Sequence, residues 1–309
     1  MKSTAQSQAE ASKAATQPAR AMLAMLAAMV LFTSMGVFIR LAAQEIPALE
    51  IVFFRNFFAL LLLVPVLIHK GIGLLRSRNV GLYCLRAGIN IVAMIAGFTA
   101  LTLIPLTEAT ALGFTAPLFV TIGAVLILGE VIRFRRVMAL ALGFLGVMIV
   151  LGAELGSVSV GALLALINAL LIAVTGLIVK RLTASEPVEA IIIWMVLLST
   201  PLSLVPALFV WQWPDLVTLF WLVCLAGAGT LGHFCWTRAC SLADITQLQP
   251  LEFVKLPLMA LAGYLIFTEI PTSSIWVGGA IIFLSTAYIT HREAQIARAE
   301  RNRVRSPVQ

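Results

Sequence analysis

Two charged residues, Glu252 and Lys255, lie three positions apart near the middle of the mainly apolar stretch 244–268. If this stretch is a continuous helix, the two side chains share one of its faces. One interpretation is a buried ion pair that fixes packing. The interpretation that we favour is that Lys255 faces a central cavity, where an anionic or electron-rich ligand group, or a proton, takes the place of Glu252. Pro250 and Pro257 favour such a cavity because they free backbone carbonyls.

Other polar and aromatic residues inside apolar stretches extend this candidate site. His233 and Trp236 are three residues apart and share a helix face. His233 is suited to carry a proton because imidazole titrates near pH 6.5, and the alternative is a core histidine bonded to a backbone carbonyl. Asn90 is suited to hydrogen bonding a substrate or another helix, and Phe114 to contacting a flat solute. The predicted site contains Lys255, Glu252, His233, Trp236, Asn90 and Phe114.

Three further charges lie within apolar stretches or at their edge, and we expect each to have a structural role. Glu50 and Arg55 are five residues apart, so they do not stack on one helix face, and each is expected to pair with another helix. Arg86 lies near the start of its stretch and is expected to reach toward the membrane surface.

The composition excludes whole classes of protein. Of the 309 residues, 61% are apolar and 11% are charged, and the mean hydropathy is +1.03. Soluble domains average about 45–50% apolar and about 25% charged residues. We therefore expect neither a soluble nor a disordered protein, and no nucleic-acid partner, because the basic residues lie in short runs between apolar stretches. The composition predicts a polytopic protein embedded in the lipid bilayer.

Ten stretches are apolar enough to cross a membrane, which takes about 20 residues of helix. Eight lack acidic and basic residues, and two contain charges. The stretches are 21–39, 47–68, 87–107, 109–129, 137–153, 155–179, 190–214, 216–237, 244–268 and 270–290. The predicted fold class is an all-α membrane protein with ten transmembrane helices.

The distribution of Lys and Arg predicts the orientation. Of the 21 basic residues, 17 lie in the two tails and the even-numbered linkers, and only Arg40 lies in a linker on the other side. Because basic loops stay in the cytoplasm, both termini are expected on the cytoplasmic side of the membrane.

The chain divides into two halves of five stretches each. We predict a disordered cytoplasmic tail over 1–20, repeats over 21–153 and 155–290, and a basic cytoplasmic tail over 291–309. Since five is an odd number, the second half enters the membrane from the opposite side, which makes the repeat inverted. Chance similarity between apolar helices is the alternative. The support comes from a proline followed by a glutamate near the end of the fourth and ninth stretches, Pro117 with Glu130 and Pro257 with Glu269.

The order and spacing of several motifs over residues 21–293 resemble the EamA-type branch of the drug/metabolite transporter superfamily. The motifs are Pro105-Leu106-Thr107-Glu108-Ala109, Ala116-Pro117-Leu118, Gly129-Glu130, Pro250-Leu251-Glu252-Phe253, Phe267-Thr268-Glu269 and Tyr288-Ile289-Thr290-His291-Arg292-Glu293. Members of that branch are ten-helix bacterial carriers of two five-helix repeats, so the resemblance implies a location in the inner membrane of a bacterium. The resemblance implies transport of a small organic metabolite without ATP, and the branch includes importers of riboflavin and S-adenosylmethionine and exporters of amino acids.

We therefore expect a secondary transporter that works by alternating access, with a riboflavin-like vitamin, S-adenosylmethionine or an amino acid as the candidate substrate. An efflux pump for amino-acid metabolites or drugs is one alternative, and a channel or membrane scaffold is another. We expect no enzyme, cofactor or metal. The G-x-G-x-x-G match at 227–232 is no dinucleotide site, because it lies inside an apolar stretch and indicates helix packing. Coupling to a proton or an exchanged solute, and a homodimer, stay open.

Overall fold

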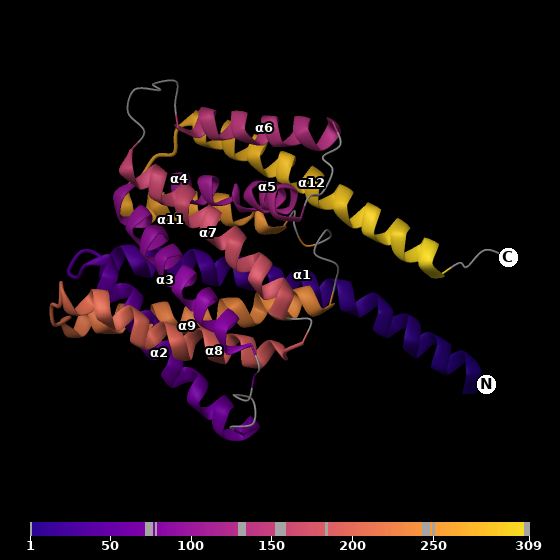
Figure 1. Cartoon of the computed structure of the whole chain (residues 1–309), viewed down its shortest axis with the longest axis horizontal. Helices are drawn as coiled ribbons and strands as arrows, with labels where there is room; N and C mark the ends of the chain where they lie inside the picture. Colours follow the sequence, from indigo (N-terminus) through magenta and orange to yellow (C-terminus); the bar gives the residue numbers. More distant parts are fainter. Residues whose placement is uncertain are drawn as a thin grey trace.

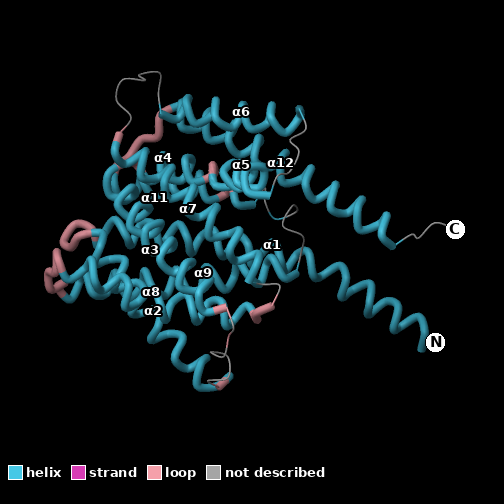
Figure 2. Tube along the Cα trace, viewed as in Figure 1, coloured by secondary structure: helices cyan, strands magenta, loops and turns pink. Residues whose placement is uncertain are grey.

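The protein is a bundle of helices in the computed structural model (Figure 1). The structure describes residues 2–71, 77, 79–128, 134–151, 159–182, 185–242, 248 and 251–305, and these ranges contain helices and loops but no strand (Figure 2). The helices are α1 (Lys2–Ala42), α2 (Ala48–Lys70), α3 (Val80–Leu103), α4 (Leu106–Gly113), α5 (Ala116–Leu128), α6 (Phe134–Leu151), α7 (Val160–Leu182), α8 (Val188–Leu208), α9 (Leu216–Leu242), α11 (Lys255–Phe267) and α12 (Ser273–Arg305).

Each apolar segment of these helices overlaps one of the ten predicted stretches. Seven segments are long and apolar enough to cross a membrane, and three shorter apolar helices lie at Val137–Leu151, Lys255–Phe267 and Ser273–Ile289. The fourth stretch is filled by α4 and α5 together. The prediction of an all-α protein with ten apolar spans is thus confirmed.

Some boundaries differ from those expected. The third span begins at Val80 rather than at residue 87, because Arg86 is accommodated inside the helix, and it ends at Leu103 because Pro105 precedes the next helix. Helix α1 includes the residues for which a disordered tail is expected, since an Ala-rich sequence continues an existing helix at little cost. The domain boundaries themselves stay a prediction.

Two of the spans are interrupted at corresponding positions. Residues 114 and 115 form a turn between α4 and α5, and residues 253 and 254 form a turn before α11. Pro117 is the second residue of α5 and Pro257 is the third residue of α11. Proline suits the first turn of a helix, where its missing N–H is not needed, but it disrupts a helix interior. The two prolines therefore account for the interruptions.

The pattern of contacts between helices stays the same when the two halves of the chain are exchanged. Helix α1 packs against α9, as α3 packs against α7, and α2 packs against α9, as α3 packs against α8. If each span is matched with the span five places later, these pairs are equivalent. The pairs α2–α8, α4–α11 and α6–α12 map onto themselves, and Figure 1 shows α6 and α12 along one edge of the bundle, far from α2 and α8. This is the contact pattern of two structurally repeated halves.

Backbone contact between α6 and α12 depends on two glycines. The carbonyl oxygen of Gly278 lies 2.8 Å from the point where a Cβ on Gly146 would stand, and the carbonyl oxygen of Gly146 lies 2.6 Å from the equivalent point on Gly278. A larger residue at either position would push the helices apart.

We therefore expect Gly278→Ala to lower the free energy of unfolding by about 1–3 kcal/mol, because the new methyl group meets a backbone carbonyl. The matched control is Gly88→Ala in α3, where no atom lies within 4 Å of the added Cβ. That change should raise the stability by up to about 1 kcal/mol, because alanine favours the helix. Thermal unfolding of the two variants in detergent tests the opposite signs, and equal effects would contradict the close contact.

Candidate functional site

His233 is exposed, although the residues that precede it on the same face of α9 are buried. Leu222, Ala226, Gly229 and His233 follow one another at helical spacing and form a single stripe. The first three are buried, whereas His233 is exposed. The strongly exposed apolar residues of α9, which include Phe234, lie on a different side of the helix from this stripe. His233 therefore faces accessible space among the helices rather than the lipid.

The guanidinium of Arg55, on α2, lies against the same stripe. Arg55 is only 5% exposed, and its Nη2 and Nε atoms lie 3.5 and 3.6 Å from the point where a Cβ on Gly229 would stand. Gly229 precedes His233 by about one helical turn. Nη1 of Arg55 donates a hydrogen bond of 3.1 Å to Oδ1 of Asn56, and its buried Nε has no hydrogen-bond partner among the described residues. The cation therefore keeps an unused donor beside His233.

Phe32 of α1 connects His233 with Lys255. The ring centroids of Phe32 and His233 are 5.1 Å apart in an edge-on arrangement, and Nζ of Lys255 lies 6.0 Å from the Phe32 centroid. The ring approaches this closely because it packs on Gly232. Two of the predicted site residues, His233 and Lys255, thus contact the same aromatic ring. Within the described part of the chain, the His233 ring makes no hydrogen bond to a backbone carbonyl, which was the alternative.

Glu252 forms a hydrogen bond with Trp236, and its interaction with Lys255 is electrostatic and longer than an ion pair. Nε1 of Trp236 donates a hydrogen bond of 3.1 Å to Oε1 of Glu252, which brings two further predicted residues together. The expectation that Glu252 and Lys255 share a face of one continuous helix is wrong, because α11 begins at Lys255 after the turn at 253–254. Among the described residues, no ion pair joins these two charges.

An aromatic cluster occupies both helix interruptions. The ring of Phe114, at the first interruption, lies 5.8 Å from that of Phe253, at the second, and Phe283 of α12 contacts both at 6.1 and 4.5 Å between centroids. Oγ1 of Thr286 donates a 3.3 Å hydrogen bond to the carbonyl of Phe114. Phe114 is thus directly beside the residue that follows Glu252.

Asn90 is not joined to the other candidates by a hydrogen bond or ring contact within the described chain. Its Nδ2 contacts Sδ of Met94 in the same helix at 3.4 Å. Arg86, one turn earlier, donates a 3.0 Å hydrogen bond to the carbonyl of Ile191 in α8, so it links two helices instead of reaching toward the membrane surface. The role of Asn90 stays a prediction.

Two residues of this region were not identified from the sequence. Arg55 was interpreted as structural, although a charge within an apolar stretch was the available signal. Phe32 resembles any other phenylalanine of an apolar helix, so no local signal distinguishes it. Its position between His233 and Lys255 depends on three helices that are distant in the sequence.

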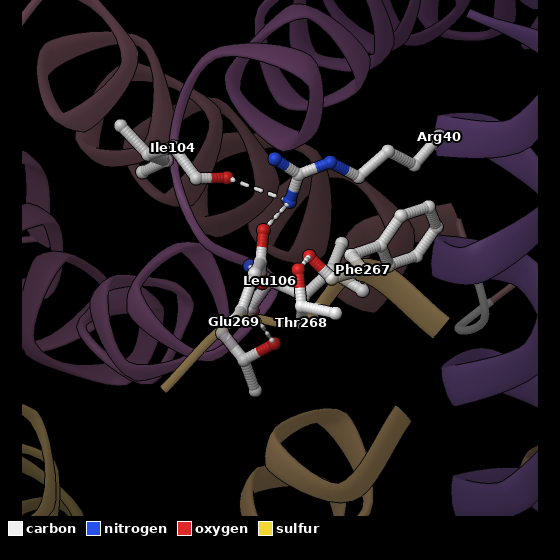
Figure 3. A network of polar contacts seen from close by, with 7 residues as sticks. Arg40, Ile104, Leu106, Phe267, Thr268 and Glu269 are labelled. Carbon is white, nitrogen blue, oxygen red and sulfur yellow. Dashed lines mark hydrogen bonds and ion pairs between the residues drawn. The ribbon is translucent and has the colours of Figure 1, made fainter. Parts of the chain in front are cut away.

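One end of the bundle, which we call the Arg40 end, is held by a carboxylate between the two halves (Figure 3). Glu269, just after α11, forms an ion pair with Arg40 of α1, and its Oε2 accepts a 3.0 Å hydrogen bond from the backbone N–H of Leu106 at the start of α4. Arg40 also donates to the carbonyl of Ile104 at 3.3 Å. Thr268 places the carboxylate by adopting a left-handed conformation with φ 55°. A single acidic side chain thus joins three segments.

The opposite end, which we call the Ser77 end, has its own contact between the halves. The Ser77 hydroxyl and Nδ2 of Asn79, on the α2–α3 linker, donate hydrogen bonds to the carboxylate of Glu186 on the α7–α8 linker. These two hydrogen bonds lower the pKa of Glu186 from its ordinary value, so the carboxylate is charged at neutral pH. Each end is therefore fastened by an acidic residue of the second half.

Comparison with known proteins gives matches over nearly the whole chain. The model of the EamA-like transporter family matches residues 19–152 and again residues 159–291. A riboflavin transporter of Vibrio cholerae is 34% identical over 260 residues, which cover 83% of this chain and 87% of the relative. A riboflavin transporter of Rhizobium johnstonii is 33% identical over 92% of this chain and 96% of its own length. An S-adenosylmethionine uptake transporter of Rickettsia prowazekii is 29% identical over 79% of this chain and 83% of its own length.

The Arg40 end provides a test of the site geometry. We expect Glu269→Gln to lower the free energy of unfolding by about 1–3 kcal/mol, because the ion pair with the part-buried Arg40 is lost. Glu45→Gln is the matched control, since Glu45 is an exposed acid near the same end. Thermal unfolding of the purified variants measures both effects, and an unchanged melting temperature for Glu269→Gln would argue against the network of Figure 3.

Proposed function

Because the chain belongs to the EamA-like transporter family, we propose that it transports a flat heteroaromatic metabolite of the riboflavin type. Membership confirms the prediction of a secondary transporter for a small organic metabolite, and of a transporter rather than an enzyme. The observation that carries the choice of substrate is the similarity to two riboflavin transporters, at 34% and 33% identity over most of each chain.

The interior of the bundle is suited to such a solute. Phe114 and Phe253 contact each other at the two helix interruptions, and Phe32 and Trp236 lie beside Lys255 and Glu252, respectively. Aromatic rings stack favourably on a planar heteroaromatic system. We propose that the substrate binds between these rings, in contact with the predicted site residues, which are Lys255, Glu252, His233, Trp236, Asn90 and Phe114.

The two fastened ends support alternating access. The ion pair of Arg40 with Glu269 closes one end, and the hydrogen bonds of Ser77 and Asn79 to Glu186 close the other. Each contact joins the first half to the second, so each has to open when the halves move apart on that side. In the proposed cycle the ends open in turn, and the substrate passes through the centre.

We also propose an inner-membrane location with both termini in the cytoplasm. Figure 1 shows the N- and C-terminal ends of the chain emerging on the same side of the bundle. This is the Ser77 end, because α2 and α7 finish there and α12 runs toward it from the Arg40 end. The basic residues of the tails and even-numbered linkers favour the cytoplasm for this side.

Uptake by cells tests the proposed substrate. Expression of the chain in a bacterium that neither makes nor imports riboflavin should restore growth on micromolar riboflavin, whereas S-adenosylmethionine and amino acids should not be taken up. Purified protein in liposomes should exchange internal for external riboflavin faster than it permits net flux, as a carrier does and a channel does not. Uptake of S-adenosylmethionine without uptake of riboflavin would contradict the proposal.

The orientation has an independent test. Reporter enzymes fused before residue 1 and after residue 309 should both show activity in the cytoplasm only. The reason is that 17 of the 21 basic residues lie in the tails and even-numbered linkers, and basic segments stay in the cytoplasm. A fusion in the linker at 43–47, after Arg40, should be active outside the cytoplasm. A periplasmic signal from either terminus would refute the proposed topology.

A further inference from the structure

We propose that Arg55, His233 and Lys255 form an electropositive binding centre that holds the oxygen-rich part of the substrate and disfavours cationic substrates. The recognised chemistry is a group of hydrogen-bond-accepting oxygens, in carbonyl, carboxylate or phosphate form. The inference rests on the proposed function, which it deepens by assigning the charge of the accepted substrate.

The three side chains come from different helices and meet at one level. Arg55 of α2 packs on Gly229 of α9, one turn before His233, and His233 contacts Phe32, whose ring lies beneath Nζ of Lys255 at the start of α11. His233 is the accessible member, and it is exposed on an otherwise buried stripe. A substrate group that reaches His233 is therefore close enough to interact electrostatically with Arg55 and Lys255.

The acidic residues nearest along the chain accept hydrogen bonds from other groups, and Glu252 offsets part of the charge of Lys255 from beyond ion-pair distance. Glu252 accepts the hydrogen bond of Trp236, and Glu50 accepts a 2.8 Å hydrogen bond from the backbone N–H of Gln212. Neither forms an ion pair with Arg55 or Lys255 within the parts of the chain that the structure describes. Arg40 differs, because Glu269 neutralises it at the end of the bundle.

Arg55 has no ion-pair partner among the described residues, and this has a physical consequence. A buried cation without an anion is costly, so a ligand that supplies acceptor oxygens gains from meeting one. Nε of Arg55 is buried and unpaired among the described residues, which provides a donor that needs such an oxygen. Because a hydrogen bond to a charged group is strong, each one changes the affinity by roughly tenfold to a hundredfold. A cationic ligand loses these bonds and is also repelled.

This charge separates the candidate substrates. The isoalloxazine ring of riboflavin is uncharged and has two carbonyl oxygens, so it fits the proposed centre. The sulfonium of S-adenosylmethionine is a cation, whereas S-adenosylhomocysteine lacks only its methyl group and that charge. The two adenosyl compounds therefore form a matched pair that tests the charge preference separately from the identity of the substrate.

The first experiment measures binding of riboflavin, flavin mononucleotide and the two adenosyl compounds to the purified wild-type protein in lipid nanodiscs by titration calorimetry. We expect both flavins to bind, and S-adenosylhomocysteine to bind at least tenfold more tightly than S-adenosylmethionine. No variant is needed for this comparison. Binding of S-adenosylmethionine that is as tight as that of S-adenosylhomocysteine, or tighter, would overturn the electropositive centre, whatever the flavins do.

The second experiment removes the charges one at a time. Arg55→Gln and Lys255→Met should each weaken riboflavin binding by about tenfold or more, and Arg55→Lys should retain more of the affinity than Arg55→Gln. Arg181→Gln is the matched control because Arg181 is exposed at the end of α7, and it should bind riboflavin as the wild type does. The melting temperature of each variant shows whether it is folded.

The outcomes for the two proposals are distinct. If riboflavin binds but the folded Arg55→Gln and Lys255→Met variants bind it equally well, the electropositive centre is refuted while the proposed function stands. If no flavin binds but S-adenosylhomocysteine is preferred over S-adenosylmethionine, the proposed substrate is refuted and the centre is supported. Failure of all four compounds to bind the wild type would overturn both.

Discussion

Inside a lipid bilayer each backbone N–H and C=O group has to find its hydrogen-bond partner within the protein, and the rest of this structure depends on that constraint. Helices satisfy it, which is why the apolar stretches of the chain are helical. An interruption of a helix is tolerated only in the protein interior. The turn at Phe114 meets this condition, because Thr286 of α12 donates to its carbonyl and the Thr115 hydroxyl donates to the carbonyl of Leu112.

The same constraint explains the use of charged side chains. Glu50 and Glu269 accept hydrogen bonds from backbone N–H groups of Gln212 and Leu106, and Arg86 donates to the carbonyl of Ile191. Each of these charges satisfies the backbone of a segment far away in the sequence. Arg55 and Lys255 are different, since neither forms an ion pair with a described carboxylate and Lys255 interacts with Glu252 only at longer range. This difference makes the centre of the bundle chemically distinctive.

The sequence predicted the spans well because hydrophobicity is a local property. It did not predict the interruptions, although Pro117 and Pro257, at matching places in the two halves, were the available signal. It did not predict where the helix before Pro257 ends, so Glu252 and Lys255 were placed on one helix face that does not exist. The contacts of Phe32 and Arg55 could not be predicted, because they depend on which helices become neighbours.

The packing of α1 on α9 has a consequence for biogenesis. The end of α1 at residue 42 and the start of α9 at residue 216 are separated by most of the chain. At a synthesis rate of about 5–20 residues per second, α1 spends roughly 9–35 s in the membrane before α9 exists. Glu269, the ion-pair partner of Arg40, is synthesised later still. The first half is therefore inserted as an incomplete assembly, in which lipid or the insertion machinery covers surfaces that the second half later buries.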